Sequence, residues 1–150
     1  MRDKTPFTST ARIPVASELG AAKLATLSLI NAGADFIFHQ ANEAGRGVFQ
    51  ACSERKVRCF GSNKNQNELA PDVIVASAVL DVPGAIVRMV RTVRDGQFKP
   101  EIQHFGMREG VVTLEWNEAL KSQVSPATVA EVARLEQEIK AGRLKVPTGF

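Results

Sequence analysis

The chain has 150 residues, of which 44% are hydrophobic and 23% charged, and its net charge is +3 at pH 7. These values are those of an ordinary globular domain, and they exclude a disordered or fibrous protein. The sequence has no apolar run of about 18 residues, so it predicts no membrane-spanning helix. The charge is too small to indicate an anionic partner.

Residues 1–16 show no helical or strand periodicity, and we expect a flexible leader there, ahead of one domain over 17–150. The charged first residues are followed by no apolar stretch, so the chain as given encodes no export signal. A start as abrupt as this is typical of a piece cut from a longer protein, and we expect the chain to be such a piece.

Helical and strand patterns alternate along the rest of the chain. This alternation predicts right-handed βαβ units, and hence an α/β fold with an open, mainly parallel sheet and flanking helices. The expected elements, in order, are a helix from Ser17 to a stop at Gly33, strand 34–39, helix 47–55, strands 57–60 and 72–79, a helix begun by Asp81 and Pro83 and ended by Gly96, short strands 101–106 and 110–114, and a last helix from Ser125 to Gly142.

The two cysteines, Cys52 and Cys59, fall on an expected helix and an expected strand, which favours buried thiols over a disulfide or a metal site. Zinc needs about four nearby ligands, and only His39 and His104 remain as soft candidates. His104 in a short strand is more typical of a structural histidine. We therefore expect no metal and no other cofactor.

Three loops follow expected strands, at 39–46, 62–67 and 77–81. Ligands of open parallel sheets bind beyond the carboxyl ends of the strands. Amide side chains, which are dense in the second loop, both donate and accept hydrogen bonds and so suit a nucleobase or a sugar. Ordinary turn chemistry explains an Asn-rich loop equally well. The residues that we predict to contact a small-molecule ligand are His39, Asn42, Arg46, Asn63, Gln66 and Ser77.

Other kinds of site are less favoured. Gly45-Arg46-Gly47 opens like a dinucleotide-binding fingerprint, but Gln50 stands where the third glycine is needed. The sequence has no Walker loop, no nucleophile elbow and no helical histidine pair at zinc spacing, so it predicts no enzyme. Arg88, Arg91 and Arg94 form a basic stripe, which is more often the solvated face of an amphipathic helix than a nucleic-acid site.

Several short motifs stand in a characteristic order from about residue 20 onward. They are GADFIF at 33–38, GVFQAC at 47–52, FGSNKNQ at 60–66, LAPDVIVAS at 69–77, DGQF at 95–98, the Gly-bounded segment 106–114 and KVP at 145–147. Each motif is moderately specific, but their shared order resembles the basic-membrane-protein (BMP) family. Members of that family are type I solute-binding lipoproteins that deliver purine nucleosides and related ligands to ABC transporters.

The resemblance implies the carboxy-terminal ligand-binding lobe of a two-lobed protein, with a returning segment at about 82–114 and a closing helix back in that lobe. It also implies a nucleoside-like ligand, an ABC transporter permease as partner, and a periplasmic or cell-surface location. Asn63, Asn65 and Leu80 depart from the family pattern, which alters the polar groups for a base or sugar. Without the other lobe, the returning segment should expose apolar surface. We expect the chain either to form a homo-oligomer through that surface or to rearrange these pieces into a single domain.

Non-catalytic ligand binding is thus the leading hypothesis, and three alternatives stay open. The first is a cytoplasmic sensor or regulatory module of the same fold. The second is an open α/β enzyme with His39 as its base, which requires a partner acid or nucleophile that the sequence does not show. The third is nucleic-acid binding through the arginine stripe, which predicts a steep loss of affinity with salt; we do not expect a nucleic-acid partner.

Overall fold

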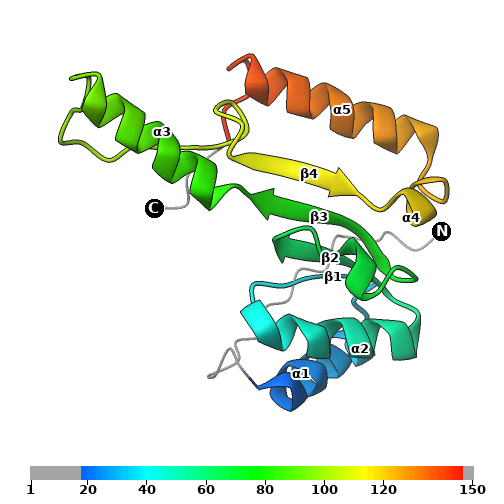
Figure 1. The fold of residues 1–150 in the computed structure, drawn as a ribbon. Coiled ribbons are helices and arrows are strands. Elements are labelled where there is room, and N and C mark those ends of the chain that lie inside the picture. The colour runs from blue at the N-terminus through cyan, green and yellow to red at the C-terminus, as the bar shows by residue number, and fades with distance from the viewer. Residues whose placement is uncertain (1–17, 147–150) are drawn as a thin grey trace. The chain divides into compact units, whose positions relative to one another are not determined.

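The computed structural model describes residues 18–146 (Figure 1), so the expected leader over 1–16 lies outside the described residues. Helices and strands alternate through most of the chain. The elements are α1 (Leu19–Asn31), β1 (Phe36–Phe38), the 3-10 helix η1 (Asn42–Ala44), α2 (Gly45–Arg55), β2 (Arg58–Asn63), the 3-10 helix η2 (Asn67–Leu69), β3 (Ile74–Leu80), α3 (Val82–Arg94), β4 (Val112–Trp116), α4 (Glu118–Lys121) and α5 (Pro126–Lys140).

The four strands form one open sheet in the order β1-β2-β3-β4. β1 and β2 are parallel, with Phe38 opposite Phe60. The next strand continues beside β2, where the backbone N–H of Cys59 donates to the carbonyl of Val73 over 3.0 Å. β4 runs against β3 at the other edge (Figure 1). The expected α/β class with a mainly parallel sheet is confirmed.

One expected strand is wrong. Residues 101–106 form no strand, and Ile102 within them is 84% exposed. A strand needs a neighbour to receive its hydrogen bonds, whereas the backbone N–H of Glu101 donates locally, to the carbonyl of Lys99 over 2.8 Å. The following strand forms as β4, at 112–116 in place of 110–114, and the short helix α4 after it was not predicted.

The described chain divides into two compact units. The first comprises 18–78 and 115–122, and the second comprises 79–114 and 123–146. β3 and β4 each contribute residues to both units. The second unit contains residues 82–114, where the returning segment is expected, and it also contains α5.

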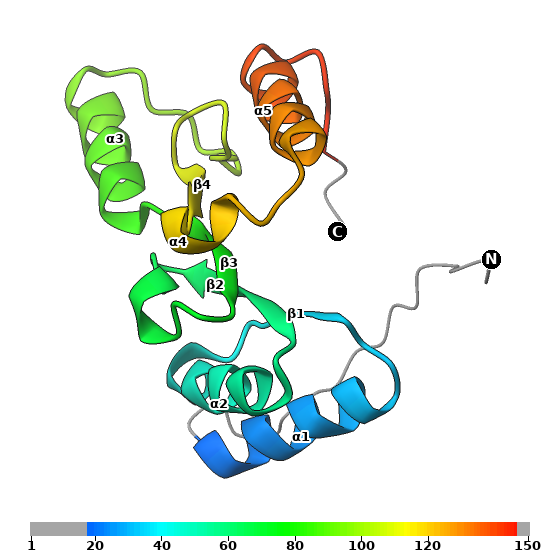
Figure 2. The same ribbon diagram turned by 90° about the vertical axis from the view of Figure 1, so that its right-hand side faces the viewer.

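The core of the first unit lies between the sheet and the pair α1 and α2, which pack side by side (Figure 2). Gly47 allows this close packing, because a Cβ there would lie 2.1 Å from the carbonyl oxygen of Leu19. Ile37, Phe49 and Ile74 are among the buried core residues. Burial of such side chains supplies most of the stability of a small α/β unit.

Cys52 on α2 and Cys59 on β2 lie in this core as free, fully buried thiols, as expected. The neighbouring Cys52 thiol, together with burial, raises the pKa of Cys59, so Cys59 stays protonated. Neither thiol is placed to react with solvent.

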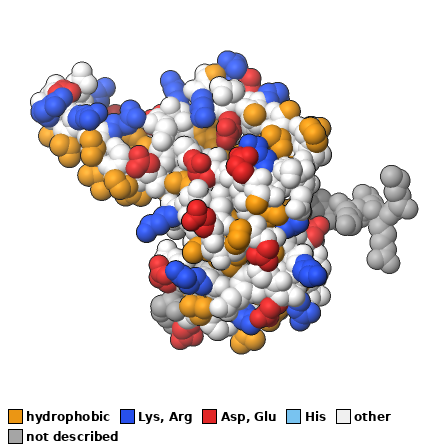
Figure 3. Space-filling model, turned by 45° about the vertical axis from the view of Figure 1, so that its right-hand side comes forward, with side chains coloured by type: hydrophobic (Ala, Val, Ile, Leu, Met, Phe, Trp, Pro, Cys, Tyr) orange, Lys and Arg blue, Asp and Glu red, His pale blue; other side chains and the backbone are white. Residues whose placement is uncertain are grey.

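The first helix of the second unit is α3, whose N-cap Asp81 accepts a hydrogen bond from Gly84 N–H over 2.9 Å. The α5 helix begins in the same way, with Ser125 accepting from Thr128 N–H over 3.1 Å. α3 has no buried residue. Hydrophobic side chains gather along one side of it and basic side chains along another (Figure 3).

Candidate functional site

His39, directly after β1, is the buried centre of the predicted ligand site, with 6% of its surface exposed. Its ring meets that of Phe49 edge-on at a centroid distance of 5.0 Å. Nδ1 accepts a hydrogen bond from the backbone N–H of Ala41 over 3.3 Å, so the proton of the neutral ring sits on Nε2. Within residues 18–146, the buried Nε2 atom has no hydrogen-bond partner.

Burial lowers the pKa of His39 below its ordinary value of 6.5, and the adjacent Gln66 side chain partly opposes this shift. Desolvation disfavours the imidazolium form because charge is poorly solvated inside a protein. The ring is therefore neutral near pH 7. It offers a hydrogen-bond donor at Nε2 and no positive charge.

Gln66 connects His39 to β3. Its side-chain oxygen accepts from the backbone N–H of Ser62 over 2.8 Å, and its own backbone N–H donates to the Ser77 hydroxyl over 3.0 Å. The Ser77 hydroxyl donates in turn to Asn67 Oδ1 over 2.8 Å. Because Ser77 is fully buried and both bonds are internal, its side chain fixes the loop between β2 and β3.

Asn42 and Asn63 lie where the chain leaves β1 and β2. Asn42 begins η1 with a φ of 45° and is exposed, and Asn63 ends β2 with a φ of 66° and is half-buried. Asparagine tolerates this left-handed region better than most residues. The left-handed backbone conformation is therefore sufficient to explain why asparagine occurs at both positions, with or without a contact from the amide to a ligand.

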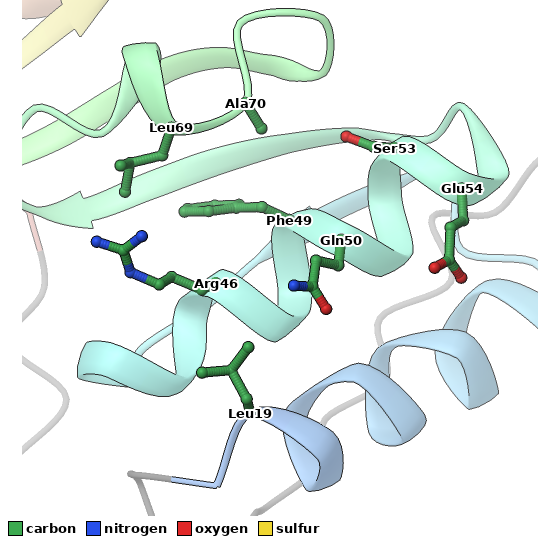
Figure 4. A pocket seen from close by; sticks show the side chains of 8 residues that line it. All are labelled: Leu19, Arg46, Phe49, Gln50, Ser53, Glu54, Leu69 and Ala70. Carbon is green, nitrogen blue, oxygen red and sulfur yellow. The ribbon is translucent and has the colours of Figure 1, made fainter.

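Arg46 lies in the first turn of α2, 3.9 Å from Glu43, and its side chain is 59% exposed. It lines a pocket of about 410 Å³ between α1, α2 and η2 (Figure 4). Arg46 stands at one end of the lining residues and Glu54 at the other, with the Phe49 ring between them (Figure 4). None of the other five predicted residues lines this pocket.

The structure thus brings together His39, Gln66 and Ser77, while Arg46 belongs to a separate pocket. Two buried polar residues beside these side chains were not among the predicted ligand contacts. The Ser62 hydroxyl is buried and has no hydrogen-bond partner within the described part of the chain. Asn67 is buried and donates from Nδ2 to the carbonyl of Glu115 over 3.1 Å, a contact between residues 48 positions apart. Both residues belong to the loop 62–67, and the density of polar side chains in that loop was the sequence signal that could have identified them.

Among residues 18–146, no three His, Cys, Asp or Glu side chains are grouped so that they could hold a metal ion. In the same range, no helix is long and apolar enough to span a membrane.

The fold is similar to that of solved solute-binding proteins. An ABC transporter solute-binding protein from Aeropyrum pernix K1 matches with a TM-score of 0.74 and 20% identity over 89% of this chain and 46% of its own. One from Conexibacter woesei matches with a TM-score of 0.58 and 20% identity over 87% and 43%. A transcriptional activator of the comK gene from Bacillus halodurans matches with a TM-score of 0.70 and 19% identity over 91% and 47%.

The chain therefore spans less than half the length of each of these proteins. No match was found among curated proteins. The family model described as "ABC transporter substrate-binding protein PnrA-like" matches residues 9–149, nearly the whole sequence. The chain belongs to this family of PnrA-like ABC transporter substrate-binding proteins.

Proposed function

We propose that the chain binds a small, nucleoside-like molecule without chemical conversion and serves as the ligand-binding part of an ABC transporter substrate-binding protein. The ligand occupies the loops beyond β1 and β2 and contacts His39, Asn42, Asn63 and Gln66, whereas Arg46 lines a separate pocket. Ser77 acts indirectly, since its hydroxyl holds the Gln66 loop. The whole protein works outside the cytoplasm and passes its ligand to a transporter permease.

The observation that carries this proposal is the buried Nε2 atom of His39, which has no hydrogen-bond partner among residues 18–146. More than nine in ten buried polar groups in proteins are hydrogen-bonded. The ring is held by Phe49 and Ala41 and its Nε2 atom is itself buried, so the surrounding loops must open before a ligand acceptor can reach this donor. The neutral ring favours a ligand acceptor such as a ring nitrogen or a hydroxyl over one that needs a cationic partner.

A non-catalytic role is supported by the surroundings of His39. General-base catalysis needs a second group to orient or share the proton. Within the described part of the chain, His39 contacts the Ala41 backbone N–H, the Gln66 amide and the Phe49 ring, and none of these three groups is an acid or a nucleophile.

Calorimetric titration of the 150-residue chain with adenosine, guanosine, inosine, cytidine and ribose tests the proposal. We expect saturable binding of at least one purine nucleoside, and weaker binding by His39→Ala. Leu24→Ala, at a 70% exposed position on α1, is the control and should bind as the unchanged chain does. Circular dichroism of each variant verifies that it is folded. Absence of heat with every compound, from a folded chain, would refute a nucleoside ligand.

A second candidate function is a ligand-sensing regulatory module. The similarity to a protein named as a transcriptional activator favours it, since the same fold then serves both transport and regulation. Mass spectrometry of the natural polypeptide distinguishes the two roles. A DNA-binding domain on the same polypeptide would favour regulation, and a lipid-modified amino terminus would favour transport.

A further inference from the structure

Cys52 and Cys59 are neighbours in the core of the first unit, and the proposed ligand site uses neither of them. Cys52 lies in the last turn of α2, and Cys59 is the second residue of β2. Both side chains are fully buried, and both belong to the same cluster of core residues. A hydrogen bond joins the two thiols. The sequence has no other cysteine, so each thiol is the only partner within the chain with which the other can form a disulfide.

The turn between α2 and β2 fixes this proximity. Lys56 has a φ of 54°, in the left-handed region. Its N–H donates to the carbonyl of Ser53 over 3.3 Å, and the N–H of Val57 donates to the carbonyl of Cys52 over 3.0 Å. These two bonds are those of a Schellman motif, which ends a helix and turns the chain away from the helix axis. The chain therefore enters β2 beside the last turn of α2, and Cys59 follows Cys52 by only seven positions.

The alternation of side chains along β2 sets the direction of the Cys59 thiol. Cys59 stands opposite Ile37 of β1, and both side chains are buried. The next residue, Phe60, stacks on Phe36 with a centroid distance of 6.0 Å, and Phe36 is 56% exposed. Because successive side chains point to opposite faces of a sheet, Cys59 points to the face that the helices cover. A disulfide needs two Cβ atoms that point toward each other, and Cys52 lies in that same layer.

We propose that Cys52 and Cys59 form a disulfide between α2 and β2 when the chain folds in an oxidising compartment. The proposed function supplies such a compartment, since proteins outside the cytoplasm fold where disulfides persist. The placement of the two thiols does not depend on that function.

The oxidant is a disulfide of the surroundings, such as oxidised glutathione. One cysteine thiolate attacks a sulfur of that disulfide and releases the first glutathione as a thiol. The sulfur of the second cysteine then attacks the mixed disulfide and releases the second glutathione thiol. Two electrons and two protons thus pass from the cysteines to glutathione.

The hydrogen bond from Cys59 lowers the pKa of Cys52, while burial opposes this shift. Cys52 therefore ionises first and is the attacking group. Because both thiols are buried in the folded chain, the attack takes place during folding or when the core opens locally.

Equilibration of the 150-residue chain with mixtures of reduced and oxidised glutathione tests the proposal, once in buffer and once in urea that unfolds the chain. Mass spectrometry after an acid quench gives the fractions of dithiol, internal disulfide and glutathione adduct. We expect the equilibrium constant for the internal disulfide to be at least about tenfold larger for the folded chain, because a bond that fits the fold is favoured by it. An equal or smaller constant, or a folded chain that accumulates the glutathione adduct, would overturn the proposal. The measurement needs no ligand, so its outcome is independent of the nucleoside titration.

The double variant Cys52→Ala with Glu54→Cys is the matched control. Glu54 pairs with Lys23 and so points toward α1 (Figure 4). The two cysteines of this variant stay close in sequence, so its unfolded chain should close the disulfide about as well as the unchanged chain does. Its fold, verified by circular dichroism, should give no preference for the bond. If the folded variant favoured the disulfide as strongly as the unchanged chain, closeness in sequence and not the α2–β2 contact would be the cause, and the proposal would fail.

Discussion

The buried hydroxyl of Ser77 donates a hydrogen bond to Asn67 Oδ1 over 2.8 Å. The same oxygen accepts from the Gln66 backbone over 3.0 Å, and Asn67 continues the connection to the carbonyl of Glu115 over 3.1 Å. One side chain of β3 therefore fixes the loop after β2, and that loop is tied to the end of β4. In the proposed site, Ser77 positions Gln66 beside His39.

Ser77→Ala should lower the free energy of unfolding by about 1–3 kcal/mol, because Asn67 Oδ1 and the Gln66 N–H lose their partner inside the protein. Urea denaturation measures the change. Ser53→Ala is the matched control, since the Ser53 hydroxyl makes a long bond of 3.4 Å to Asp72 near the surface, and it should cost no more than about 0.5 kcal/mol. Equal stability of Ser77→Ala and the unchanged chain would contradict the positioning role.

The lowered pKa of His39 predicts how stability depends on pH. Its folded pKa lies below the ordinary value of 6.5, so the unfolded chain takes up a proton at a higher pH than the folded chain does. Stability is therefore fully present above about pH 6.5 and falls as the pH drops from there toward the folded pKa.

His39→Asn should remove this contribution while its amide oxygen replaces Nδ1 as the acceptor for Ala41. Urea unfolding between about pH 5 and 8 should show a shallower loss of stability for the variant than for the unchanged chain. Identical pH profiles would show that burial of His39 does not affect its titration.

The sequence predicted those features that depend on local interactions. The N-caps Asp81 and Ser125 each bond to a residue three positions ahead, and both helices begin as expected. Local signals also placed His39 at the end of a strand. The strand over 101–106 was wrong because its apolar pattern carries no information about a partner strand, which is set by the rest of the fold.

The buried polar residues that fix the site were harder to predict. Asn67 bonds to Glu115, and Asn117 bonds to Pro71 and Ile74, which are 46 and 43 positions away. Before the strands are paired, no pattern separates these asparagines from those of ordinary turns. Their role follows only from tertiary structure, in which a buried amide must find partners.

Asn117 ties the end of β4 to β3. Its Nδ2 donates to the carbonyls of Pro71 and Ile74 over 3.0 and 2.7 Å, and its Oδ1 caps α4 at Ala119 N–H over 3.1 Å. Asn117→Ala should lower the free energy of unfolding by about 2 kcal/mol or more, because these buried groups lose a partner. Thermal unfolding followed by circular dichroism measures the effect.

Asn117→Asp separates the two roles of this residue. Aspartate keeps an acceptor for the cap but places a carboxylate against two carbonyl oxygens, so at pH 7 it should destabilise at least as much as alanine. Asn31→Ala, at an exposed position on α1, is the control and should be nearly neutral. A stable Asn117→Asp variant would show that the cap, and not the two donated bonds, is what matters.

Two glycines near helix starts should respond in opposite directions to alanine. At Gly20 in α1, a Cβ would meet no atom of residues 18–146 within 4 Å, so Gly20→Ala should stabilise by roughly 0.5–1 kcal/mol through helix propensity. At Gly45 in α2, a Cβ would lie 2.4 Å from Cε1 of His39. The ring is buried between Phe49 and the Ala41 N–H, so it has little room to move. Gly45→Ala should therefore destabilise by about 1–3 kcal/mol despite its better propensity.

A double-mutant cycle identifies the clash. In a His39→Ala background the imidazole is gone, so Gly45→Ala should cost much less there than in the unchanged chain. Urea denaturation of the four proteins gives the coupling free energy between the two positions. If Gly45→Ala lowers the free energy of unfolding equally in both backgrounds, the strain lies elsewhere in α2. The start of α2 would then not be what holds the His39 ring in place.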